Sequence, residues 1–212
     1  MVKMNEATAY TMSPRRQRNR DAMIQTILDT ARAIMRAEGV AALSMQELAR
    51  RLDMRAPSLY NYFPGRMAIY DALFRLGFTL FGETMTLAVA GATTWSEEVR
   101  CTFEAYMTFA LQNPELYQLC FERPVPGFVP SEASLQVSFG QLHAGYARVE
   151  RWRASIHNDL STEQTADLVI AMMHGLTALH LSNEPHLPVG QGRFGALIQP
   201  MLLVLEKAWS QP

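Results

Sequence analysis

Apolar residues recur along most of this chain at the three- and four-residue spacing of amphipathic helices. The first such stretch covers residues 20–38, and Gly39 follows it in the position of a helix-ending glycine. Its apolar face is formed by Ile24, Ile27, Leu28, Ala31, Ile34 and Met35. No segment shows the two-residue alternation of a half-buried strand. The pattern therefore predicts an all-α protein.

Helical spacing continues through the remainder of the chain. The predicted helices cover residues 67–90, 94–112, a segment from 113, 131–158, 161–181 and about 194–209. Thr94 with Glu97, and Ser161 with Gln164, have the spacing of capping boxes, which favours helix starts there. Pro200 lies inside the last apolar pattern, so we expect either a kink or a late helix start.

Between Ser44 and Arg66 the pattern predicts two short helices instead of one long one. Ser44 and Glu47 have the spacing of a capping box. Asp53 tolerates the left-handed conformation of a tight turn, and Pro57 suits the first turn of a second helix. Two short helices joined by such a turn form the helix-turn-helix plan, whose second helix enters the DNA major groove.

Residues 42–73 resemble the DNA-binding domain of the tetracycline-repressor (TetR) family of bacterial regulators. The matching positions are Ser44, Leu48-Ala49, Leu59-Tyr60-Asn61-Tyr62-Phe63 and Arg66. The sequence departs from the family pattern at Asp53, where Gly is usual, at Tyr62, where His is usual, and at Arg66, where Lys is usual. Tyrosine keeps a donor that reaches phosphate, and arginine keeps the positive charge.

This resemblance implies an N-terminal three-helix DNA-binding domain and a larger C-terminal helical domain for ligand binding and dimerisation. We expect a mobile tail over residues 1–14, the DNA-binding domain over 15–66, and the regulatory domain over 67–212. The implied protein is a cytoplasmic homodimer that pairs through its last two helices and binds a palindromic operator in double-stranded DNA. The family's usual mode is repression that a small effector releases, and the composition favours an apolar or aromatic effector.

The second short helix supplies most of the expected DNA contacts. By resemblance, Ser44, Tyr60, Tyr62 and Arg66 bond phosphates, while Leu59 and Phe63 anchor the helix inward. Arg55 suits guanine and Asn61 suits adenine. The alternative for the two tyrosines is ordinary packing. The complete set of candidates is Ser44, Arg55, Ala56, Pro57, Ser58, Tyr60, Asn61, Tyr62 and Arg66.

The charges are divided unevenly along the chain. Residues 15–66 hold ten arginines and five acids, whereas residues 67–212 hold eight basic and fourteen acidic side chains. A basic first part suits a polyanionic partner. The arginines at 15, 16, 18 and 20 precede the predicted first helix, where they either contact phosphate or the minor groove or simply aid solubility.

The second half is rich in methionine and aromatic residues, most of which must form the core. In the resembling family, the interior of this half holds the effector. The candidate ligand contacts are Phe81, Met85, Phe103, Tyr106, Met107, Tyr117, Phe121, His143 and His174. His174-Gly175 resembles a Trp-His-Gly motif of one family branch, with Met173 in place of Trp. His174 either faces a ligand or bonds a core carbonyl, which is the favoured role, and Gly175 suits close helix approach.

Other classes of protein find less support. Metal-binding, phosphate-binding and nucleophile motifs are missing from the sequence, so we expect no enzyme, no metal and no cofactor. Cys101 and Cys120 read as reduced core thiols. Neither a signal peptide nor an apolar run of about 18 residues is seen, so we expect no membrane span. A non-specific architectural DNA-binding protein remains the main alternative, although the acidic second half disfavours it.

Overall fold

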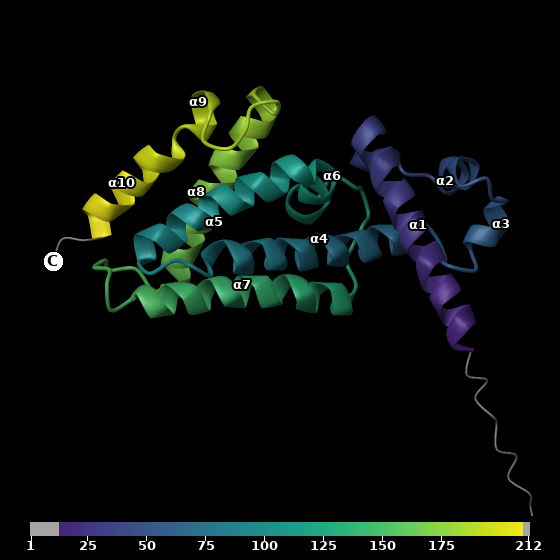
Figure 1. Ribbon diagram of the computed structural model, residues 1–212, viewed down its shortest axis with the longest axis horizontal. Coiled ribbons are helices and arrows are strands. Elements are labelled where there is room, and N and C mark those ends of the chain that lie inside the picture. The colour runs from purple at the N-terminus through teal and green to yellow at the C-terminus, as the bar shows by residue number, and fades with distance from the viewer. Residues whose placement is uncertain (1–12, 210–212) are drawn as a thin grey trace, which may run out of the picture. The chain divides into compact units, whose positions relative to one another are not determined.

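The computed structural model describes residues 13–209, which contain helices, turns and loops and no β-strand. The elements are α1 (Pro14–Glu38), η1 (Val40–Ala42), α2 (Met45–Arg51), α3 (Ala56–Leu59), α4 (Arg66–Val89), α5 (Trp95–Gln112), α6 (Pro114–Tyr117), η2 (Gln118–Glu122), α7 (Glu132–Trp152), α8 (Thr162–Asn183), α9 (Gly192–Gly195) and α10 (Ile198–Trp209). Figure 1 shows them in chain order. The all-α prediction is confirmed.

The chain divides into two compact units, residues 1–69 and 70–212. The first unit carries α1 to α3 and the first turn of α4, and the second carries the other helices. This is the predicted arrangement of an N-terminal helix-turn-helix domain and a larger helical domain. A tail was predicted over residues 1–14, and its first twelve residues lie outside the described part of the chain. Pro14 already belongs to α1.

The first helix is longer than the sequence pattern predicts. It begins six residues before the expected start, because Pro14 occupies the first position, where a missing N–H costs little. Arg15, Arg16 and Arg18 therefore lie on the first turns of α1, and the prediction that they precede the helix is wrong. Gly39 ends the helix with φ 95°. The buried face consists of Ile27, Leu28, Ala31, Ile34 and Met35.

Both capping boxes predicted for the second unit are present. The Thr94 hydroxyl accepts the Glu97 amide at 3.2 Å, and the Glu97 carboxylate accepts the Thr94 amide at 3.3 Å. Ser161 and Gln164 make the same reciprocal pair at 3.1 and 3.0 Å. These contacts satisfy amides that have no partner within the helix, and so they set where α5 and α8 begin.

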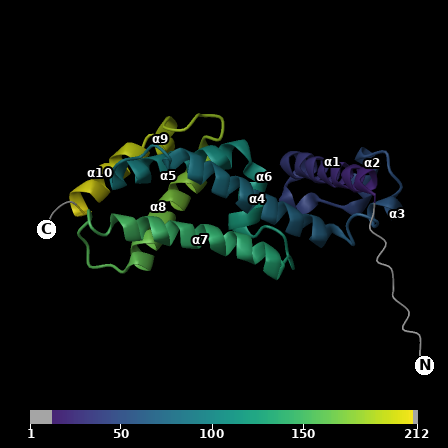
Figure 2. The same ribbon diagram turned by 60° about the horizontal axis from the view of Figure 1, so that its bottom comes forward.

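A carboxylate on α4 holds the start of α7. Asp71 accepts hydrogen bonds from the backbone amide of Ser131 at 2.7 Å and from its hydroxyl at 2.9 Å. Burial alone would raise the Asp71 pKa, but the hydrogen bonds from Ser131 and Ser134 outweigh it and leave the pKa below its ordinary value. In Figure 2, α7 runs alongside α4 from this point. It ends at Trp152, six residues before the predicted end.

The C-terminal pattern forms two helices, of which α10 starts late. Pro200 is the third residue of α10, so the late start is the alternative that holds. The Trp95 and Trp209 rings lie 5.6 Å apart and fix the end of α10 against the start of α5. The inner face of α10 consists of Ile198, Leu202, Leu205 and Trp209.

Gly77 and Gly175 differ in how closely other atoms pack against them. A Cβ placed on Gly77 of α4 would meet the Cys120 Sγ at 2.6 Å, so the absence of a side chain there permits close packing of η2 on α4. Gly175 has no heavy atom within 4 Å of such a Cβ. The close approach predicted at Gly175 is therefore wrong within this chain, and Gly77 has that role instead.

Length and composition alone would allow α4 to cross a membrane, a test that core helices of soluble proteins also pass. In this structure α4 contributes Tyr70, Leu73, Phe74 and Phe78 to the core of the second unit. One third of its 18-residue apolar window is buried within this chain, so its length and composition are weak evidence for a membrane span.

We expect Gly77→Ala to lower the free energy of unfolding by about 1 kcal/mol or more. Overpacking typically costs about 1–3 kcal/mol, which exceeds the gain in helix propensity of up to about 1 kcal/mol. Urea denaturation followed by circular dichroism measures the change. Gly140→Ala is the matched control, because Gly140 lies in α7 with open space around it and should be neutral or stabilising. If Gly77→Ala were as stable as this control, the close packing would be contradicted.

Candidate functional site

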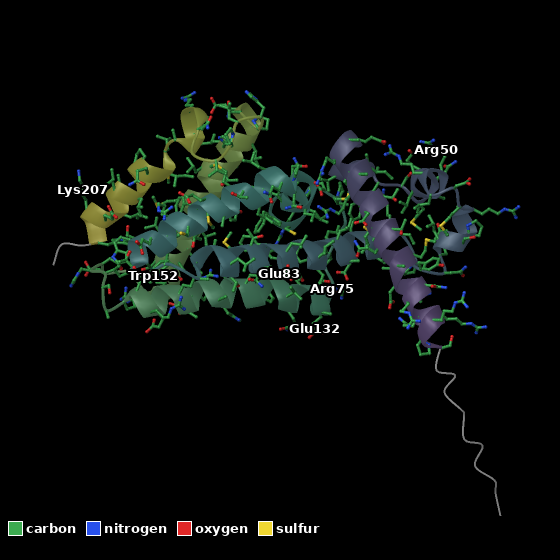
Figure 3. All side chains as sticks on the ribbon, in the orientation of Figure 1. Arg50, Arg75, Glu83, Glu132, Trp152 and Lys207 are labelled. Atoms are coloured by element: carbon green, nitrogen blue, oxygen red, sulfur yellow. The ribbon has the colours of Figure 1, made fainter. Side chains whose placement is uncertain are left out.

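The helix-turn-helix segment begins with half of the predicted capping box. The Ser44 hydroxyl accepts the Glu47 amide at 3.2 Å. The Glu47 carboxylate, however, accepts from the Nε atoms of Arg50 and Arg51, at 2.8 and 2.7 Å. Hydrogen bonds from these two arginines lower the Glu47 pKa to about 2. Arg51 also pairs with Glu38. The two arginines therefore stabilise α2, and Arg50 projects from its outer side (Figure 3).

The turn and the second helix follow the predicted order but not the predicted length. Asp53 adopts φ 51°, the left-handed conformation expected of it. Helix α3 covers only Ala56–Leu59, and single turns continue the chain to Phe63. The prediction of a helix to residue 63 is therefore wrong. Pro64 accounts only for Phe63, because the residue directly before a proline is disfavoured in the helical conformation.

One face of α3 and its following turn is exposed, whereas the other is buried. Leu59 is fully buried and Phe63 nearly so, which confirms their predicted inward packing. Tyr60 has 54% of its surface exposed. Arg55, Pro57, Asn61 and Arg66 are exposed, and Ser44, Ala56, Ser58 and Tyr62 are partly exposed. All nine predicted DNA contacts thus reach the surface of the first unit.

Arg20 supports this face from α1. Its Nη1 donates to the Asn61 carbonyl oxygen at 3.0 Å, and its guanidinium lies 5.3 Å from the centre of the Tyr62 ring. From the sequence, Arg20 either contacts phosphate or the minor groove or aids solubility, and both stay predictions. The structure adds that Arg20 holds the turn after α3.

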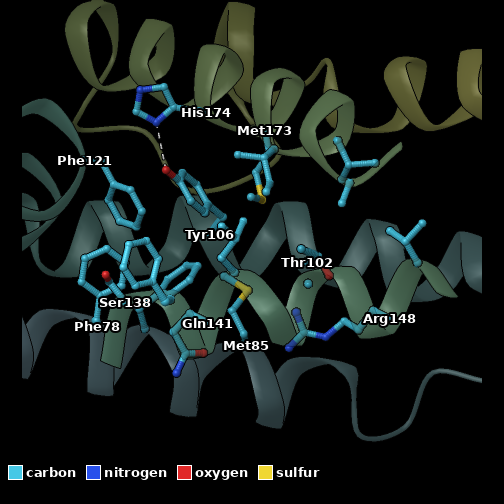
Figure 4. A pocket seen from close by; sticks show the side chains of 18 of the residues that line it. Phe78, Met85, Thr102, Tyr106, Phe121, Ser138, Gln141, Arg148, Met173 and His174 are labelled. Carbon is cyan, nitrogen blue, oxygen red and sulfur yellow. Dashed lines mark hydrogen bonds between the residues drawn. The ribbon is translucent and has the colours of Figure 1, made fainter. Parts of the chain in front are cut away.

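The second unit contains a cavity of about 430 Å³, drawn in Figure 4. It lies among α4, α5, α7 and α8, and η2 adds one side chain. Its lining residues are Phe78, Phe81, Met85, Thr102, Tyr106, Phe121, Ser138, Phe139, Gln141, Leu142, Gly145, Arg148, Val149, Trp152, Ala166, Val169, Ile170, Met173 and His174. A volume of this size suits a small organic molecule.

Aromatic rings form one wall of the cavity. Phe81 lies edge-on to Tyr106 and to Phe121, with ring centres 5.7 and 5.5 Å apart. Phe78 completes the group at 5.3 Å from Phe121. Phe121 comes from the π-helical turn η2, a rare geometry that is frequent at functional sites. This wall presents rigid apolar surface.

His174 lies at the cavity wall with two tyrosine partners. Its Nδ1 is 2.9 Å from the Tyr106 hydroxyl and 3.2 Å from the Tyr117 hydroxyl. The core carbonyl bond favoured from sequence is wrong for His174. His180 makes that kind of bond, because its Nε2 donates to the Leu187 carbonyl at 3.0 Å. Burial raises the Tyr117 pKa to about 12 and the Tyr106 pKa well above its ordinary value.

A charged cluster lies at another part of the wall. Glu98 accepts from Arg151 Nη2 at 2.8 Å and from the Trp152 indole at 2.7 Å. Arg148 lines the cavity, and its Nε is 3.7 Å from the same carboxylate. Burial lowers the Arg148 pKa, partly offset by Glu98. In Figure 4 Arg148 lies away from His174 and Phe121, near Thr102.

Five of the nine predicted ligand contacts line the cavity: Phe81, Met85, Tyr106, Phe121 and His174. Phe103 and Met107 are buried elsewhere in the core. Tyr117 does not line the cavity, but its hydroxyl contacts His174, which does. His143 is exposed on α7. Sequence reasoning missed Arg148, Gln141 and Trp152, although their seven- and four-residue spacing marks one helical face.

The fold and these two surfaces define a class: an all-helical protein with a helix-turn-helix unit and a cavity-bearing helical unit. Residues 27–73 match the family model "Bacterial regulatory proteins, tetR family", and residues 99–198 match "Tetracyclin repressor-like, C-terminal domain". The chain belongs to the TetR family of bacterial regulatory proteins.

Relatives and solved structures agree with this assignment. The HTH-type transcriptional regulator YobS of Bacillus subtilis is 34% identical over 92 residues, 43% of this chain and 48% of that protein. Rv1816 of Mycobacterium tuberculosis, also an HTH-type transcriptional regulator, is 27% identical over 116 residues, 54% of this chain and 50% of that protein. The chain thus spans about half the length of these curated relatives.

Among solved structures, a protein from Rhodococcus sp. RHA1 superposes with a TM-score of 0.76 at 20% identity, covering 97% of this chain and 100% of that one. The transcriptional regulator FadR of Bacillus subtilis, solved with stearoyl-CoA, superposes with a TM-score of 0.69 at 15% identity, covering 85% and 96%. Both show the same fold.

Tyr117→Phe should change how stability depends on pH. A tyrosine with a pKa near 10 when unfolded and about 12 when folded contributes stability below pH 10 that is lost as the pH rises to 12. Phenylalanine does not ionise, so the variant does not lose this contribution. Between pH 8 and 11 its free energy of unfolding should therefore decrease by about 1 kcal/mol less than that of wild type. Urea denaturation at both pH values tests this. Equal losses in both proteins would contradict a protonated, buried Tyr117.

Proposed function

We propose that this protein is a sequence-specific DNA-binding transcriptional regulator of the cytoplasm, and that it represses until a small apolar or aromatic effector enters the cavity of its second unit. The observation that carries the proposal is the exposed polar face of α3 and its turn, set on the buried anchors Leu59 and Phe63. Membership of the TetR family supports it. The cavity supplies the place for the effector.

The expected DNA contacts follow from the exposed face. Tyr60, Tyr62, Ser44 and Arg66 have side-chain donors that suit phosphate oxygens, which position the protein without reading sequence. Arg55 and Asn61 are exposed beside them and suit base edges. Each good bidentate base contact discriminates by about 1–3 kcal/mol.

A route from cavity to DNA face exists in the covalent structure. Phe78, Phe81 and Met85 of α4 line the cavity, and the same helix begins at Arg66, one of the proposed phosphate contacts. An effector that favours one setting of α4 would therefore bias the DNA-bound population, typically with about 1–3 kcal/mol of coupling. The stearoyl-CoA bound to FadR illustrates that a protein of similar fold takes a ligand with an apolar part.

The proposed homodimer uses α8 and α10. Leu168 and Leu179 are exposed on α8, and Leu203 and Val204 are exposed on α10, which leaves apolar surface on the helices of the expected interface. Gly175 lies one or two turns from both α8 leucines with open space around it. It would allow the two copies of α8 to approach closely. A twofold pair presents two recognition helices to successive major grooves, about 34–36 Å apart or a little more.

Selection of bound duplexes from a random pool at two salt concentrations tests the proposed function. We expect a palindromic consensus whose binding weakens steeply as salt rises. Salt-sensitive binding without a consensus would favour a non-specific architectural protein instead. Absence of binding by the folded, effector-free dimer would contradict the proposed function.

Two substitutions separate positioning from base recognition on the selected operator. Tyr60→Phe removes a phosphate contact, so it should weaken binding to all sequences about equally. Arg55→Ala should relax the preference at one base pair by about 1–3 kcal/mol. Fluorescence anisotropy with the consensus and its single-base variants measures both. Wild-type behaviour of both variants would contradict the assignment of α3 to the groove.

Charged substitutions test the dimer surface. Leu179→Glu and Val204→Glu should each shift the protein toward monomer, because burying an unpaired carboxylate in an apolar interface costs several kcal/mol. Val129→Glu is the matched control, since Val129 is 79% exposed in the loop before α7 and should leave the assembly unchanged. Sedimentation velocity reports the result. A dimer that withstands both changes must use another surface.

A further inference from the structure

The cavity wall contains one charged side chain among mostly apolar neighbours. Arg148 has only 15% of its side-chain surface exposed and lies among the cavity residues together with Val149 and Val169. A guanidinium removed from water is unfavourable unless it is paired and hydrogen-bonded. The contacts of Arg148 therefore indicate whether this group is satisfied by the protein or remains available to a ligand.

The protein pairs Arg148 only loosely. Its one ion-pair contact within residues 13–209 joins Nε to the Glu98 carboxylate at 3.7 Å, which is too long for a direct hydrogen bond. Glu98 is already engaged more closely by Arg151 and by the Trp152 indole, at 2.8 and 2.7 Å. The two terminal nitrogens of Arg148 are consequently left with donors that suit a further acceptor.

The local charge is not balanced. Arg148 and Arg151 share the single carboxylate of Glu98, and these are the charged groups that act on the Arg148 guanidinium. Because Arg151 is mostly exposed and already engages Glu98, the Glu98 carboxylate does not fully neutralise Arg148, which among the described residues is the one charged side chain that lines the cavity. A ligand with one negative charge would neutralise Arg148.

The backbone leaves space beside this charge. Gln141, Gly145 and Arg148 follow at four- and three-residue spacing, so they share one face of α7, and all three line the cavity. A Cβ on Gly145 would meet nothing within 4 Å, which leaves open volume between the other two side chains. Gln141 can donate its amide to the same acceptor. Figure 4 shows Gln141 and Arg148 at this part of the cavity.

The other lining residues indicate the chemistry of the remaining part of the ligand. Phe78 and Phe121 lie at the opposite part of the cavity, and Met85 lies between them and Arg148 (Figure 4). The Phe81 ring contacts both phenylalanines. A long apolar surface with one cationic end matches a molecule with an apolar chain or ring and one acidic end.

Building on the proposed function, we infer that the effector is an amphipathic monoanion whose head group, such as a carboxylate, forms a forked pair with Arg148 while its apolar part lies against the phenylalanine wall. Arg148 is the residue that sets this specificity. Glu98 holds the guanidinium at the wall and competes with the ligand for it.

The test compares head groups on a constant body. The probes are 4-phenylbutyrate, 4-phenylbutanamide and 4-phenylbutylamine, together with octanoate and octanamide, each titrated into the full chain by isothermal titration calorimetry. Wild type should bind each carboxylate about tenfold or more tighter than its amide, and the amine most weakly, because a charge-assisted pair replaces a neutral one.

Four variants locate the effect. Arg148→Met keeps the apolar stem and should abolish the preference for carboxylate while leaving amide binding nearly unchanged. Arg148→Lys keeps the charge without the fork and should keep part of the preference. Glu98→Gln removes the competing charge and should strengthen carboxylate binding. Arg151→Met is the matched control, since Arg151 is 60% exposed and does not line the cavity, and it should alter the preference less than about threefold.

The outcomes separate this inference from the proposed function. Equal binding of carboxylates and amides, or a preference that survives Arg148→Met, would overturn the role of Arg148 but leave the cavity as an effector site. Failure of every probe to bind, whatever its head group, would overturn the inference but leave the proposed DNA binding, which the duplex selection tests separately. A preference lost in Arg148→Met and strengthened in Glu98→Gln supports the inference.

Discussion

The structure depends on how helix α4 is buried along its length. Ile69 is fully buried, and it is the last residue of the first unit. Tyr70, Leu73 and Phe74 then enter the core of the second unit, and Phe78, Phe81 and Met85 reach the cavity. One continuous helix therefore supplies side chains to both cores. Packed interiors respond to small displacements as shifts between discrete arrangements.

The helices around the cavity are joined to one another by side-chain contacts. Aromatic rings on α4, α5 and η2 contact one another edge-on, and the Tyr106–His174 bond joins α5 to α8. Asp71 and Ser131 join α4 to α7. These contacts join the helices that form the cavity walls. Charged and polar groups at the wall act in a medium of low dielectric, where a single pair contributes more than it would in water.

The fold was largely predictable because it rests on local signals. Each of these signals depends on residues that are close together in the sequence. They are the helical periodicity, the capping boxes at Thr94 and Ser161, and the left-handed turn at Asp53. The short α3 was not predicted, since the apolar pattern continues through Phe63 while the backbone does not. The early start of α1 was not predicted, since the apolar pattern begins only at Ile24, although Pro14 suits a first helical position.

The site was less predictable because it depends on contacts between distant residues. Aromatic composition pointed to Phe81, Tyr106 and Phe121, but it did not separate them from Phe103 or Met107, which face the core. Burial of Arg148 has no signature in the sequence, since the same α7 pattern contains Arg151, which is mostly exposed. His143 and His174 look alike as residues, and only packing against α5 distinguishes them.

The proposed function requires that an effector in the cavity and an operator on the DNA-binding face each weaken the binding of the other. The most direct test measures the affinity of the cavity for 4-phenylbutyrate with and without saturating operator duplex. Because coupling is reciprocal, the account predicts that bound operator weakens probe binding by about 5- to 150-fold. An affinity for the probe that is the same with and without operator would contradict the account.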